Sequence, residues 1–144
     1  MKSSKLAVLV APIVLATTVV SGEASASDTS IALGEVAVPE ASCGVDHAAL
    51  RTAAEGELRI VDVSKLRKRR NVLVSVAIIG SAQAPLAFTV NALLRDAKTG
   101  TMLAVIEGSA RAEGNTTTDL VRQQVLRVAL RNAVRQIPAA LAAN

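Results

Sequence analysis

The sequence predicts a single α+β domain, with the order β-α-β-β-β-α and an antiparallel sheet of about four strands packed against two helices. Three observations support this prediction. Residues 86–113 read as strand, turn and strand, residues 72–80 are apolar on both faces, and apolar residues recur at helical spacing near the C-terminus. A run of strands flanked by two helices is typical of helices layered on one sheet.

The hairpin is the best-defined element of the sequence. Every second position from Leu86 to Leu94 is apolar, which is the period of a half-buried strand. The pattern then stops at a turn. Asp96 can accept hydrogen bonds there through its carboxylate, and Gly100 can adopt a positive φ without steric cost. Apolar residues resume at Met102, so we expect two antiparallel strands joined by a short loop.

Two further strands are expected before this hairpin. Ile31–Val38 is largely apolar, with a change of phase at Gly34 and Glu35 that a β-bulge would produce. Pro39 should end this strand, because proline cannot donate to a ladder of hydrogen bonds. Val72–Gly80 is apolar on both faces, and this predicts a central strand.

Two helices are expected from capping residues and apolar spacing. Asp46 is a suitable N-cap for a helix over about residues 45–59. One of Thr116–Thr118 should cap the second helix, whose apolar stripe is predicted to lie on the sheet while its arginines face water. Pro138 should kink or end this second helix, because it cannot donate the next backbone hydrogen bond.

The first 26 residues have the features of a secretory signal peptide. Lys2 and Lys5 form a basic start, Leu6–Val20 is almost continuously apolar, and Ala24–Ala26 supplies the small residues that a signal peptidase requires. Cleavage would leave residues 27–144 as one exported domain, periplasmic or extracellular, without a transmembrane span. An uncleaved membrane anchor is the alternative, but the apolar run is short for a span.

The composition disfavours several classes of function. Phe88 is the single aromatic residue of the 144, and protein sites that bind nucleic acid often stack bases on aromatic side chains, so no nucleic-acid partner is expected. With one cysteine the chain can form no intramolecular disulfide. The sequence contains no phosphate-binding loop, nucleophile elbow or metal-ligand cluster. We therefore expect neither a cofactor nor catalytic activity.

Two groups of basic residues are candidate sites for an anionic partner. The first places five positive charges within six residues before the central strand, and the second places an arginine every four residues on the last helix. The groups are Lys65, Arg67, Lys68, Arg69 and Arg70, and Arg127, Arg131 and Arg135. The alternative is that they form an ordinary solvated loop and an ordinary polar helix face.

The segment LLRDAKTGTMLAVIEG, residues 93–108, precedes a long helix rich in Ala and Arg. In this it resembles the small α+β domains of bacterial envelope proteins in the group of the curli-secretion protein CsgG, the penicillin-binding-protein activator LpoB and the N-terminal domain of TolB. The resemblance covers about Val72 to Leu141, and the chain lacks the lipobox cysteine of that group. It implies an envelope-located binding or assembly module, and no catalytic residue carries over.

We therefore expect an exported, non-catalytic envelope binding or assembly module whose partner is an envelope protein or an anionic envelope component. Two alternatives stay open. One is a small thiol-dependent or hydrolytic enzyme that uses Cys43 and His47, since a thiolate beside an imidazole can act as a nucleophile. The other is a structural subunit that self-associates through its apolar sheet.

Overall fold

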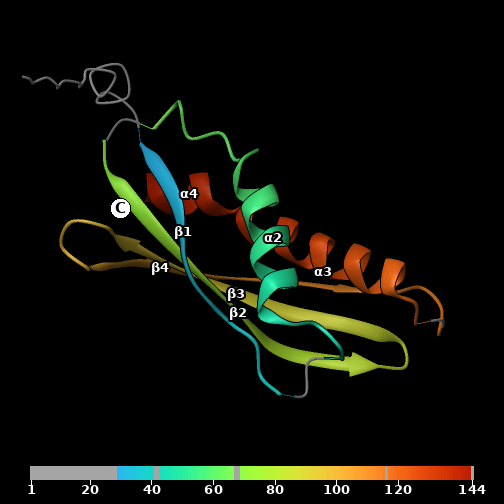
Figure 1. Ribbon diagram of the computed structural model, residues 1–144. Coiled ribbons are helices and arrows are strands. Elements are labelled where there is room, and N and C mark those ends of the chain that lie inside the picture. Colours follow the sequence, from blue (N-terminus) through green and yellow to red (C-terminus); the bar gives the residue numbers. More distant parts are fainter. Residues whose placement is uncertain (1–28, 41–42, 67–68, 116, 144) are drawn as a thin grey trace, which may run out of the picture.

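The structure is a computed structural model that describes residues 29–40, 43–66, 69–115 and 117–143. The predicted signal peptide, residues 1–26, lies outside the described residues. The elements are β1 (Ser30–Ala37), α2 (His47–Leu58), β2 (Asn71–Gln83), β3 (Leu86–Asp96), β4 (Met102–Arg111), α3 (Asp119–Val134) and α4 (Ile137–Ala142). The four strands form one sheet in the order β1-β2-β3-β4 (Figure 1). The predicted fold class and number of strands are confirmed.

The sheet is mixed, so the prediction of an antiparallel sheet is wrong at one edge. β2, β3 and β4 pair antiparallel, as the hairpin pattern indicated. β1 instead runs parallel to β2, with Ser30 opposite Asn71 and Ala37 opposite Ala77. The reason is the connection: α2 carries the chain from the end of β1 back to the start of β2, and such a crossover gives both strands the same direction.

Two irregularities shape the strands. The register between β1 and β2 shifts between Leu33 and Val36, which confirms the predicted bulge. A second shift falls between Ile78 and Gly80, and β2 continues past it to Gln83. The predicted strand ended at Gly80, but Gly80 lies at an irregularity within a longer strand, a common role for glycine in strands.

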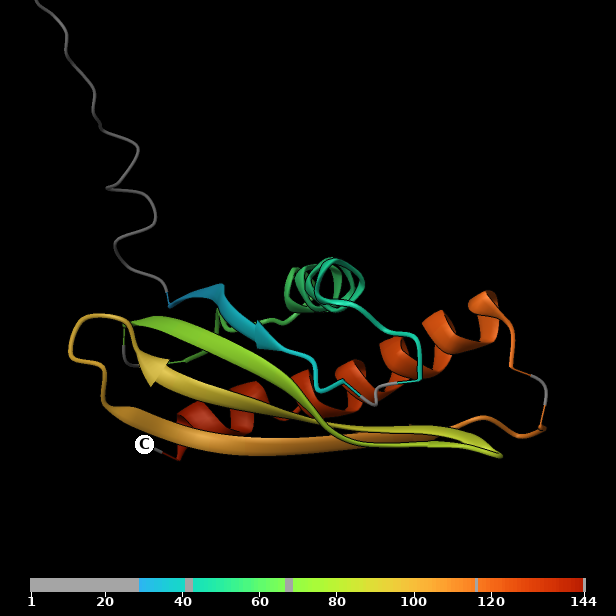
Figure 2. The same ribbon diagram turned by 60° about the horizontal axis from the view of Figure 1, so that its bottom comes forward.

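The helices cover one face of the sheet, and the core lies between these layers. The side chains of β2 and β3 on this face are at most 2% exposed, from Val72 to Ile78 and from Leu86 to Leu94. α3 lies against β3 and β4, and α2 lies against β1 (Figures 1 and 2). The predicted single C-terminal helix is divided: α3 ends at Val134, and α4 begins at Ile137 with a proline in its first turn.

No described element covers the opposite face of the sheet. Leu73 and Ile79 on β2 and Val105 on β4 are 38%, 49% and 57% exposed. The central position predicted for β2 is confirmed, since it pairs with β1 and β3, but only one of its two apolar faces is buried.

The turn between β3 and β4 is held by Asp96, as predicted. Its Oδ1 accepts hydrogen bonds from the backbone N–H groups of Lys98 at 2.8 Å and Thr99 at 3.1 Å. Gly100 has a φ of 76°, a conformation that other residues adopt only with strain. The turn chemistry therefore fixes the register of the hairpin.

These backbone hydrogen bonds, first from Lys98 and then from Thr99, lower the pKa of Asp96. A carboxylate with a lowered folded pKa contributes stability above its unfolded pKa of about 3.9, and this contribution is lost as the pH falls through the folded pKa. We expect Asp96→Asn to lower the free energy of unfolding at pH 7, and the gap from wild type to close below about pH 4. Urea denaturation at a series of pH values measures this gap, and a gap that persists to about pH 2 would contradict the assignment.

Candidate functional site

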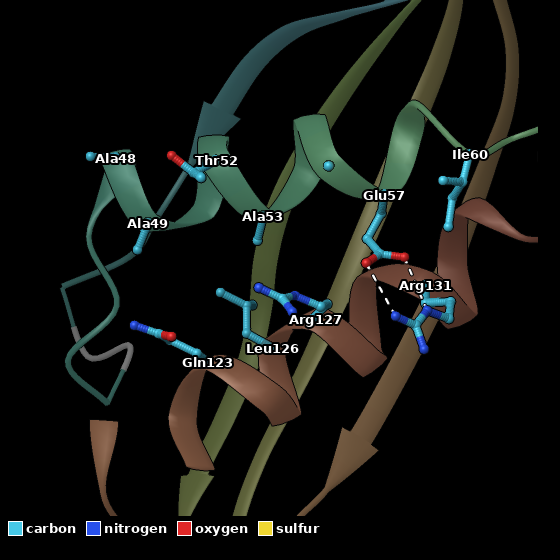
Figure 3. A pocket seen from close by; sticks show the side chains of 11 residues that line it. Ala48, Ala49, Thr52, Ala53, Glu57, Ile60, Gln123, Leu126, Arg127 and Arg131 are labelled. Carbon is cyan, nitrogen blue, oxygen red and sulfur yellow. Dashed lines mark hydrogen bonds and ion pairs between the residues drawn. The ribbon is translucent and has the colours of Figure 1, made fainter. Parts of the chain in front are cut away.

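A groove of about 620 Å³ lies between α2 and α3 and is open to solvent (Figure 3). Both helices contribute to its walls. The lining residues are Ala48, Ala49, Thr52, Ala53, Gly56, Glu57 and Ile60 on the α2 side and Gln123, Leu126, Arg127 and Arg131 on the α3 side.

The groove exists because the α2 side presents mostly small residues. Ala49 and Ala53 point toward α3, while Leu126 points toward α2 (Figure 3). Methyl groups do not fill the space that larger side chains would occupy between two helices. Leu126 is only 3% exposed and gives the groove an apolar floor.

Glu57 and Arg131 form an ion pair across the two helices. Nε of Arg131 donates to Oε1 of Glu57 at 3.1 Å, and Nη2 donates to Oε2 at 3.4 Å (Figure 3). The side chain of Glu57 is 6% exposed and that of Arg131 is 47% exposed. The hydrogen bond that Arg131 donates to Glu57, followed by the negative charge of Glu57, raises the pKa of Arg131. Arg131 therefore does not simply face water, which corrects the prediction for this residue.

Glu57 was not among the predicted site residues, although the sequence contains a signal for it. It follows Leu50 by seven positions and Ala54 by three, and both of these are fully buried. Residues at these spacings share one face of a helix. An acid on an apolar stripe is buried at a cost unless it is paired, so it indicates a basic partner elsewhere.

The other two predicted arginines of α3 occupy different environments. Arg127 lines the groove, and no other described residue forms an ion pair or hydrogen bond with its side chain. Arg135 donates to Oδ1 of Asn132 at 3.3 Å and lines a smaller cavity of about 340 Å³ beyond the Glu57–Arg131 pair. Since Glu57 holds Arg131, Arg127 is the guanidinium most available to a ligand in the groove.

The described residues of the basic segment before β2 do not line this groove. Arg67 and Lys68 lie outside the described residues. Lys65 is exposed after α2, and Arg69 and Arg70 directly precede β2. The carbonyl of Arg70 accepts a hydrogen bond of 3.0 Å from the Ser30 N–H, so this residue helps to join β1 to β2. Of the predicted basic residues that the structure describes, Arg127 and Arg131 line the groove, whereas Lys65, Arg69, Arg70 and Arg135 do not.

Cys43 and His47 lie near each other in sequence but form no hydrogen bond with each other. Cys43 is half-buried against the core, in the loop before α2, with a φ of 54°. His47 is the exposed first residue of α2. Among the described residues no group of three His, Cys, Asp or Glu side chains could hold a metal ion. A thiol-dependent activity of this pair stays a hypothesis.

The fold defines the class: a small α+β domain with helices on one face of a mixed four-stranded sheet. The sequence matches no protein-family model and no curated protein. In the described part of the chain, no helix has the length and hydropathy needed to cross a membrane.

Several solved structures resemble this fold at low sequence identity. The hypothetical protein CT253 from Chlamydia trachomatis is 10% identical, with a TM-score of 0.53 over 81% of this chain and 99% of that one. The PelC dodecamer from Paraburkholderia phytofirmans is 13% identical, with a TM-score of 0.49 over 74% and 89%. A minor lipoprotein from Acinetobacter baumannii is 13% identical, with a TM-score of 0.35 over 76% and 93%. The first likeness shows a shared fold, and the resemblance to the CsgG, LpoB and TolB group is not confirmed.

Proposed function

We propose that this protein is an exported, non-catalytic module of the bacterial envelope that binds an anionic, partly apolar envelope component between α2 and α3. The groove is the observation that carries the proposal, because it combines an apolar floor with the guanidinium of Arg127, which pairs with no other described residue. Its volume lies within the range of about 300–1,000 Å³ that is typical of small-molecule sites. The N-terminal sequence pattern supports the exported location.

The charges of the groove favour an anion. Glu57, Arg127 and Arg131 are its charged residues, so their net charge is +1. Arg131 cannot turn to a ligand without leaving the Glu57 carboxylate buried and unpaired, which is costly. The ligand's acidic group is therefore expected at Arg127, and its apolar part along Ala53 and Leu126.

Laurate, a twelve-carbon chain with one carboxylate, is a suitable probe of this site. We expect it to bind below its micelle-forming concentration and to shift the amide resonances of α2 and α3 in a ¹H–¹⁵N NMR titration. Arg127→Ala should weaken binding about tenfold, because a hydrogen bond to a charged group contributes about 1.5 kcal/mol. Ala53→Leu should also weaken binding, since it fills the groove without changing its charge.

Two controls separate this site from general adsorption. Arg111→Ala removes an exposed arginine at the end of β4 and should leave laurate binding unchanged. Dodecyltrimethylammonium has the same chain length and the opposite charge, so it should bind more weakly than laurate. Equal binding of the two amphiphiles, or unchanged laurate binding in both groove variants, would refute the proposal.

A further inference from the structure

We propose that the uncovered face of the sheet is the interface of a homodimer, in which two copies pack sheet on sheet about a two-fold axis. We call this surface the bare face; it consists of the strand side chains that point away from the helices. It lies on the opposite side of the sheet from the α2–α3 groove. The inference therefore does not depend on the proposed function, and each can fail without the other.

The bare face is more apolar than a solvated sheet face needs to be. A sheet with one face in water usually alternates buried apolar residues with outward polar ones. On β2, however, the outward residues include Leu73, Ala77 and Ile79, and β4 contributes Val105. Leu73, Ile79 and Val105 are each more than one-third exposed. Exposed apolar side chains that gather on one face of a sheet are a feature of interaction surfaces.

The sheet register places the centre of this patch in one cross-strand row. Ser75 on β2 lies opposite Leu93 on β3, and Leu93 lies opposite Val105 on β4. One row to one side, Leu73 is paired with Arg95. The central row thus has an arginine beside it on β3.

The row on the other side carries the opposite charge. Ala77 pairs with Asn91, and Asn91 pairs with Glu107 on β4. Arg95 and Glu107 are therefore one row away from the central row, on opposite sides of it and on neighbouring strands. With one positive and one negative group on either side of an apolar centre, the surface of one copy can match the charges of the same surface on a second copy.

A second copy satisfies this charge pattern. A two-fold axis that crosses the strands through the row of Ser75, Leu93 and Val105 exchanges the rows on its two sides. It brings Arg95 of each copy beside Glu107 of the other, so that two ion pairs flank the apolar centre. Interfaces with two-fold symmetry are self-complementary in this way, and opposite charges across an interface fix its register.

The overlap about this axis has the size of a weak interface. Leu93 lies three residues before the end of β3 and Val105 three residues after the start of β4, so about seven residues of each strand face the second copy. Four strands about 4.8 Å apart, with about seven residues of about 3.3 Å each, give roughly 440 Å² per copy. Two copies would remove on the order of 900 Å² from water, which is the size of a weak, reversible interface. Two sheets packed face to face are also a common stable architecture.

Sedimentation velocity of the full chain, purified after expression from its own first codon, tests this dimer. We expect a species of twice the chain mass at concentrations between about 1 and 200 μM. Val105→Glu places a charge at the apolar centre and should raise the dissociation constant at least 100-fold. Val128→Glu is the matched control, because Val128 is an exposed valine on α3 and its replacement should leave the dimer intact.

The charge pattern gives a second and more specific test. Arg95→Glu and Glu107→Arg should each weaken the dimer, since each sets like charges together, and the double variant should restore it. A monomer at every concentration, an assembly larger than a dimer, or a dimer unaffected by Val105→Glu would overturn the proposal. A double variant that stays monomeric would overturn the proposed axis. Far-UV circular dichroism confirms that each variant is folded.

Discussion

Gly108→Ala is expected to lower the free energy of unfolding by about 3 kcal/mol, a large loss for a single methyl group. A Cβ atom at position 108 of β4 would lie 2.4 Å from the backbone N of Ala133 and 2.5 Å from the carbonyl O of Ala129. These atoms belong to the main chain of α3, so no side-chain rotation can relieve the contact. The strand and the helix would have to move apart, which would disturb the core between them.

Urea denaturation followed by far-UV circular dichroism measures this loss. The chain contains no Trp or Tyr, so intrinsic fluorescence is a poor probe. Gly114→Ala is the matched control, because an added Cβ there meets nothing within 4 Å and should change stability by less than about 0.5 kcal/mol. A loss below about 1 kcal/mol for Gly108→Ala would show that α3 is not held against β4 at this position.

Phe88→Ala is expected to cost about 3–5 kcal/mol, the range for replacing a buried aromatic side chain by a methyl group. Phe88 is fully buried on the helix-covered face of β3 and is the largest side chain of the core. Whole domains are stable by about 5–15 kcal/mol, so this one change removes a substantial share of the total. The urea concentration at the midpoint of unfolding should therefore be lower for Phe88→Ala than for the wild type.

Two variants test whether this effect comes from the core. Thr89→Ala changes the next residue, on the other face of the same strand, and should cost much less. Phe88→Leu should fall between Phe88→Ala and wild type, because it keeps most of the buried apolar volume. Equal losses at positions 88 and 89 would indicate that strand propensity, rather than burial, determines the outcome.

Features governed by neighbouring residues could be predicted from the sequence. Asp46 caps α2 by accepting from the Ala49 N–H, and Thr118 caps α3 by accepting from the Val121 N–H. The alternation along β3 and the turn at Asp96 also follow the predicted pattern. Each depends on contacts within a few residues, where spacing and hydrogen-bonding capacity are visible in the sequence.

Features that depend on distant residues were harder to predict. Glu57 and Arg131 are separated by 74 positions, and only the packing of α2 on α3 brings them together. The groove beside them forms because the Ala and Gly residues of α2 are too small to fill the space between the helices. The distance between two helices cannot be predicted from a local sequence pattern. The parallel pairing of β1 follows from the helix that connects it to β2, a signal that the predicted order of elements already contained.

The parallel pairing of β1 also has a consequence for the order in which the chain acquires structure. The first pair of the β1–β2 ladder joins Ser30 to Asn71, 41 positions later. Closing a loop of this length costs more chain entropy than closing the short turn between β3 and β4. We therefore expect the β3–β4 hairpin to form before β1 joins the sheet.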